Sequence, residues 1–84
     1  MPVLARFCGI VIRMYFRQSE HNPPHIHAIY GEDVAAIDIM TGEVLDGYLP
    51  PKAEEKVTEW IKLHKEELDN IWNTQEFKKI EPLN

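Results

Sequence analysis

The sequence has little that a secreted, membrane-spanning or disulfide-stabilised protein would need. Its 84 residues include one cysteine, Cys8, which excludes an internal disulfide and a zinc cage built from cysteines. The longest apolar stretch, residues 3–16, is interrupted by Arg6 and Arg13, so it falls short of the ~18 residues of a transmembrane helix. It also lacks a small-residue cleavage site, so no secretory signal is expected. These absences predict one small domain, residues 1–84, in a reducing cytoplasm.

Excess positive charge is also missing. Fourteen acidic residues oppose nine basic ones, which gives a net charge of −5. Proteins that bind nucleic acid over a broad surface are usually basic, because phosphate neutralisation supplies much of their affinity. The charge is uneven, however, since residues 1–19 carry three arginines and no acid. A local basic strip in this segment is therefore compatible with RNA, and the acidic remainder with a basic protein partner.

The first half of the chain, residues 1–49, alternates apolar and polar side chains as strands do. Four strands are predicted, at Gly9–Arg17, His25–Tyr30, Val34–Met40 and Glu43–Leu49. Turn residues such as Gly31 and Gly42 join the later strands over short distances, which only antiparallel pairing permits. We expect a meander of three or four antiparallel strands. The fourth would be an exposed edge at which two copies could pair as a homodimer.

The second half is predicted to be one long helix at residues 51–75, followed by a tail at 76–84. Pro50-Pro51 ends the sheet and begins the helix, since proline is tolerated in a first helical turn. One stripe at helical spacing contains Ala53, Val57, Trp60, Ile61, His64, Leu68, Ile71 and Trp72. This stripe must be buried, which predicts an α+β fold with the helix across the apolar face of the sheet. The two tryptophans and Cys8 are assigned to the core.

Histidine is the one chemically distinctive residue type that is concentrated. His21, His25 and His27 lie within seven positions, around the pair Pro23-Pro24. Because side chains alternate along a strand, His25 and His27 are expected on the same face, about 6–7 Å apart. Imidazole changes protonation near neutral pH, so such a pair suits acid–base catalysis.

Two other interpretations of the cluster stay open. Its imidazoles could hydrogen-bond the backbone of a rigid corner and have no chemical role. They could also hold zinc, for which Glu20 or Asp38 would have to supply an orienting carboxylate. His64 lies near the centre of the helical stripe. Either its ring is buried and bonds a strand carbonyl, or it crosses the core edge to meet the cluster.

Arg13, Tyr15 and Arg17 share one face of the first predicted strand. Alternating arginine and tyrosine can contact phosphate and stack on a base. A solvated face, or ion pairs with acids such as Asp38 and Asp46, explains the same pattern. Nothing in the sequence separates these alternatives.

Four motifs extend over nearly the whole chain. They are FCGIVI at residues 7–12, HNPPHIHA at 21–28, GYLP at 47–50, and the helical set Trp60, His64 and Leu68. Together they resemble one bacterial family, domain of unknown function 4160, and HNPPHIHA is the specific part. The family usually has aspartate where this chain has Glu20. The resemblance implies a small bacterial cytosolic protein encoded beside another small protein, in a toxin–antitoxin-like pair.

These observations lead to one leading hypothesis and one alternative from another class. In the first, the protein cleaves RNA without a metal ion. Its catalytic residues would be His21, His25, His27 and His64, with Arg13, Tyr15 and Arg17 binding phosphate or substrate. In the second, it is a binding protein or the neutralising partner, and its histidines are structural or hold a metal.

Overall fold

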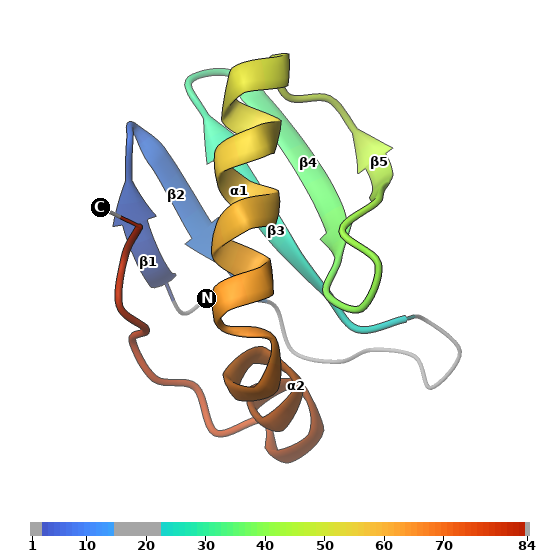
Figure 1. Cartoon of the computed structure of the whole chain (residues 1–84), viewed down its shortest axis with the longest axis vertical. Coiled ribbons are helices and arrows are strands. Elements are labelled where there is room, and N and C mark those ends of the chain that lie inside the picture. Colours follow the sequence, from blue (N-terminus) through green and yellow to red (C-terminus); the bar gives the residue numbers. More distant parts are fainter. Residues whose placement is uncertain (1–2, 15–22, 84) are drawn as a thin grey trace.

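A computed structural model of the chain describes residues 3–14 and 23–83 (Figure 1). Within these residues five strands precede two helices. The strands are β1 (Val3–Phe7), β2 (Ile10–Arg13), β3 (His25–Tyr30), β4 (Asp33–Asp38) and β5 (Val44–Gly47), and the helices are α1 (Pro51–Leu63) and α2 (Lys65–Thr74). Each strand pairs antiparallel with the next, in the order β1-β2-β3-β4-β5. The predicted α+β class and antiparallel meander are confirmed, with one more strand and one more helix than expected.

The additional strand is β1. It was missed because Leu4 and Ala5 are neighbours in sequence and both buried, which breaks the alternation typical of a strand. A bulge between Val3 and Ala5 in the pairing with β2 explains this pattern. β1 and β2 are joined by the two-residue turn Cys8-Gly9, whose φ angles of 51° and 75° are both positive, as in a type I′ hairpin. Cys8 is exposed at this turn, so its assignment to the core was wrong.

The predicted single helix is interrupted at His64. With φ −119° and ψ 22°, His64 is the C-cap of α1 and the N-cap of α2. Its backbone N–H lies 3.1 Å from the Trp60 carbonyl and 3.2 Å from that of Ile61. The new helix begins with Glu66 and Glu67 in its first turn, where the helix dipole favours negative charge. α2 therefore turns out of line with α1 and lies beyond the ends of the strands (Figure 1).

Helix α1 lies across one face of the sheet (Figure 1). Ile12, Ile26 and Ile37 of this face are fully buried beneath Trp60 and the other apolar residues of the helical stripe. The stripe is thus buried as predicted, apart from His64, which is intermediate. No described helix has the length and hydropathy that crossing a bilayer requires.

The segment after α2 closes the β1 edge of the sheet. The Ile80 N–H donates to the Leu4 carbonyl at 2.7 Å, and the Ile80 side chain is 4% exposed. The indole N–H of Trp60 donates to the Glu81 carbonyl at 2.8 Å. At the other end of the strand order, β5 pairs only with β4 in the described chain. Pairing of β5 with a second copy is still a prediction.

Gly47 provides a test of the β4–β5 register. Its φ is +83°, and a Cβ there would collide with the Val34 carbonyl oxygen, whereas a Cβ on Gly31 (φ +62°) meets nothing within 4 Å. Both alanine variants carry about 1–2 kcal/mol of backbone strain. The collision should cost Gly47→Ala about 2 kcal/mol more in free energy of unfolding, measured by urea denaturation. Equal losses in the two variants would contradict this register.

Candidate functional site

The face of the sheet turned away from α1, here called the outer face, carries the candidate site. Strand register aligns Arg13 of β2, His27 of β3, Ala36 of β4 and Asp46 of β5 in one row across it. Directly paired residues have Cβ atoms about 4.5–5.5 Å apart. His27 therefore has Arg13 on one side, and on the other the small Ala36 separates it from Asp46.

His25 and His27 form a pair on this face, as the alternation predicted. Their ring centroids are 5.2 Å apart and the rings meet edge to face at 69°. The Nδ1 atom of His25 lies 2.9 Å from the Pro23 carbonyl oxygen. A carbonyl can only accept, so this nitrogen carries the hydrogen and Nε2 is the atom that can exchange a proton. The other neighbour of His25 is Trp72, with ring centroids 5.1 Å apart.

The pKa of the His27 imidazole is lowered by its surroundings. Burial lowers the pKa of His27 below the ordinary histidine value of 6.5, and the neighbouring His25 lowers it further, while the negative charge of Asp46 acts in the opposite direction. Its Nδ1 is a buried atom, so proton exchange with a substrate would have to use Nε2. The lowered pKa favours the neutral form of His27, which can act as a base.

Arg13 is half-buried beside this pair. Its Nε is buried, and no hydrogen-bond partner for it is found among the described residues. The ion pair with Asp38 that the sequence suggested is not found in the described chain. Asp38 Oδ1 instead accepts from the N–H groups of Met40 at 2.7 Å and Thr41 at 3.1 Å. Asp38 thus closes the turn after β4, and within the described chain Arg13 has no acidic partner.

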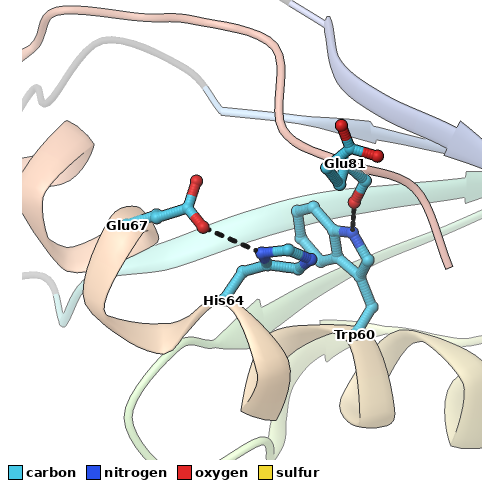
Figure 2. A network of polar contacts seen from close by, with 4 residues as sticks. All are labelled: Trp60, His64, Glu67 and Glu81. Atoms are coloured by element: carbon cyan, nitrogen blue, oxygen red, sulfur yellow. Dashed lines mark hydrogen bonds and ion pairs between the residues drawn. The ribbon is translucent and has the colours of Figure 1, made fainter.

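His64 is directed elsewhere (Figure 2). Its Nδ1 lies 3.0 Å from Glu67 Oε1, and its side chain is 14% exposed. Its ring centroid is 5.3 Å from that of Trp60, whose indole N–H bonds the Glu81 carbonyl. In the described chain His64 therefore contacts Trp60 and Glu67 and not the His25–His27 pair, and its partner is a carboxylate one turn further on, not a strand carbonyl.

A family model described as Domain of unknown function (DUF4160) matches residues 9–73. The chain belongs to this family. No curated protein and no solved structure matches the chain. The matched span of this DUF4160 protein contains the His25–His27 pair together with Arg13 and Trp72.

Three residues predicted for the site, Tyr15, Arg17 and His21, lie outside the described residues of this DUF4160 chain, as does Glu20. The described part contains no group of three or more His, Cys, Asp or Glu side chains that could hold a metal ion. His25 and His27 alone supply two of the three or four protein ligands that zinc sites use. Zinc binding by the full cluster remains a prediction.

Two neighbours of the histidine pair were not predicted as such, although the sequence had suggested Asp46 as an ion-pair partner for the Arg13 face. Asp46 reaches the row of His27 through a register that shifts between Ala36 and Ile37, and a local sequence pattern does not specify such a shift. Trp72 was assigned to the core, which its 5% exposure confirms, but its contact with His25 depends on the direction of α2. Neither contact leaves a signal in the sequence.

The lowered pKa of His27 predicts a pH dependence of stability. The unfolded chain binds a proton at His27 more readily than the folded chain does. The contribution of neutral His27 to the free energy of unfolding is therefore complete above about pH 6.5, and it is lost as the pH falls through the lower pKa of the folded state. His27→Gln should therefore lose less free energy of unfolding than the natural protein between about pH 8 and pH 5, in urea denaturation. The same loss in both proteins would show that His27 titrates normally.

Proposed function

We propose that this DUF4160 protein is the active component of a toxin–antitoxin-like pair and cleaves RNA without a metal ion. One observation carries the proposal: the His25 and His27 rings lie 5.2 Å apart beside Arg13 on the face that α1 leaves uncovered. Two imidazoles with different surroundings can divide the roles of acid and base. An arginine next to them can stabilise charge that develops on a phosphate.

The surroundings of the two rings support a division of the two roles. His27, whose pKa burial lowers, is the base. His25, whose Nδ1–H is held by the Pro23 carbonyl, is the acid when Nε2 is also protonated. Arg13 is aligned directly with His27 in the strand register, and its guanidinium would contact the phosphate oxygens.

The reaction balances with these groups alone. His27 takes the proton of a ribose 2′-hydroxyl, and the 2′-oxygen forms a bond to the adjacent phosphorus. The bond from phosphorus to the 5′-oxygen of the next nucleotide breaks, and His25 gives its Nε2 proton to that oxygen. The products are a 2′,3′-cyclic phosphate and a free 5′-hydroxyl, and the two imidazoles have exchanged protonation states.

Charge on the outer face is compatible with a local contact to RNA. Strand register places Arg6 opposite Val11, in the row next to that of Arg13, and Arg6 is exposed. Asp46 is the acid of the Arg13 row. Binding would thus involve a few phosphates near β1 and β2, in accord with a net charge of −5 for the chain, and should weaken with salt.

The net charge also favours one alternative from another class. A chain of net charge −5 attracts a basic protein, which suits the neutralising member of such a pair. In that function the His25–His27 pair has a structural role. Expression of each member of the pair by itself separates the two functions, because only the toxin arrests growth.

The catalytic proposal is tested with purified protein and a single-stranded RNA in the presence of EDTA. We expect His25→Gln and His27→Gln each to lower kcat by about 10²–10⁴-fold, the usual contribution of a general acid or base. The natural protein should show a bell-shaped dependence of kcat/KM on pH, and each variant should lose one limb of it. Circular dichroism verifies that both variants are folded.

His64→Gln is the matched comparison, since it changes the described histidine that lies outside the pair. Retained cleavage assigns the chemistry to the pair. A loss as large as that of His27→Gln would support the hypothesis of four cooperating imidazoles instead. Full activity in the double variant His25→Ala with His27→Ala would overturn the proposed function.

A further inference from the structure

Trp72 connects helix α2 to the His25–His27 pair. It is 5% exposed and follows Leu68 and Ile71 of α2, which are fully buried. Its ring centroid lies 5.1 Å from that of His25, with an angle of 54° between the ring planes. Helix α2 thus holds the Trp72 indole in the core and packs it against the His25 imidazole.

His25 is held from three directions. The Pro23 carbonyl accepts from Nδ1 at 2.9 Å, Trp72 contacts the ring, and the His27 ring meets it at 5.2 Å. The first contact selects the tautomer, and the other two restrict rotation of the ring about its side-chain bonds. Pro23 lies only two residues from His25, whereas Trp72 comes from a distant part of the chain and is fixed by the hydrophobic core.

We propose that Trp72 is a positioning residue that holds the His25 ring against His27 with its Nε2 available for proton transfer. The effect on catalysis rests on the proposed function. The effect on the His25 ring rests on the geometry alone and can be measured in a protein without activity. Trp72 is 5% exposed and its ring lies against His25, so we place its contribution in the positioning of His25.

A positioning role for Trp72 affects kcat and leaves KM nearly unchanged. Displacement of a catalytic group by about 1 Å can lower the rate by up to about 10²-fold, while ground-state binding of the substrate changes little. Loss of Trp72 should therefore lower kcat and leave KM nearly unchanged. A residue with only a structural role would instead lower the amount of folded protein, and the folded fraction would keep its kcat.

The test compares Trp72→Leu with Trp60→Phe. Trp60 is the other buried tryptophan, fully buried, but its aromatic contacts are with Phe7 and His64. The measurement is the ¹⁵N chemical shift of both His25 ring nitrogens at about pH 8, which distinguishes the two neutral tautomers. We expect the natural protein and Trp60→Phe to show the form protonated on Nδ1. Trp72→Leu should show a mixture, because a His25 ring that Trp72 no longer restrains can rotate away from the Pro23 carbonyl that selects this tautomer.

Kinetics of RNA cleavage form the second measurement. We expect Trp72→Leu to lower kcat by about 10-fold or more, with KM within about 2-fold of the natural value. Trp72→Phe, which retains an aromatic ring, should recover most of kcat, and Trp60→Phe should keep kcat in its folded fraction.

The outcomes separate this inference from the proposed function. If the natural protein cleaves no RNA, the proposed function fails, and the ¹⁵N shifts still decide the role of Trp72. If Trp72→Leu keeps a single His25 tautomer, or an unchanged kcat where the natural protein cleaves RNA, the inference is overturned. If Trp72→Leu does not fold, the natural protein decides: a mixture of His25 tautomers there, or no nuclear Overhauser contact between the Trp72 and His25 rings, would equally overturn it.

Discussion

The burial of one face of the sheet beneath α1 is the interaction on which the other features depend. Ile12, Ile26 and Ile37 are fully buried there, and burying such a side chain contributes about 1.5–3 kcal/mol. Because successive residues of a strand point to opposite faces, fixing these side chains inward directs Arg13, His25 and His27 outward. A shift of one residue in any strand would exchange the two faces, so the candidate site and the hydrophobic core are specified by the same register.

The interruption of the helix at His64 sets the direction of α2. A continuous helix would carry its whole apolar stripe along one direction, whereas α2 begins anew after His64 and lies beyond the strand ends. The pair of His64 and Glu67 lies at this joint, with the His64 ring against Trp60. The joint lets a core residue of α2, Trp72, reach His25. His64 therefore contributes to the arrangement of the molecule from a position outside the histidine pair.

The outer face combines features that are useful for proton transfer. His25 is fixed by a backbone carbonyl and an indole ring, while burial and the neighbouring His25 lower the pKa of His27. Two adjacent imidazoles disfavour simultaneous protonation, since each positive charge raises the free energy of the other.

The sequence by itself determined the α+β class, the bounds of β3, the buried stripe of the helices and the shared face of His25 and His27, because these follow from local periodicity. It did not determine β1, whose bulge hides the alternation, or the break at His64, which contains neither proline nor glycine. The surroundings of the histidine pair were decided only by tertiary structure. Asp46 arrives through an irregular strand register and Trp72 through the direction of α2, and both depend on contacts between residues that are far apart in the chain.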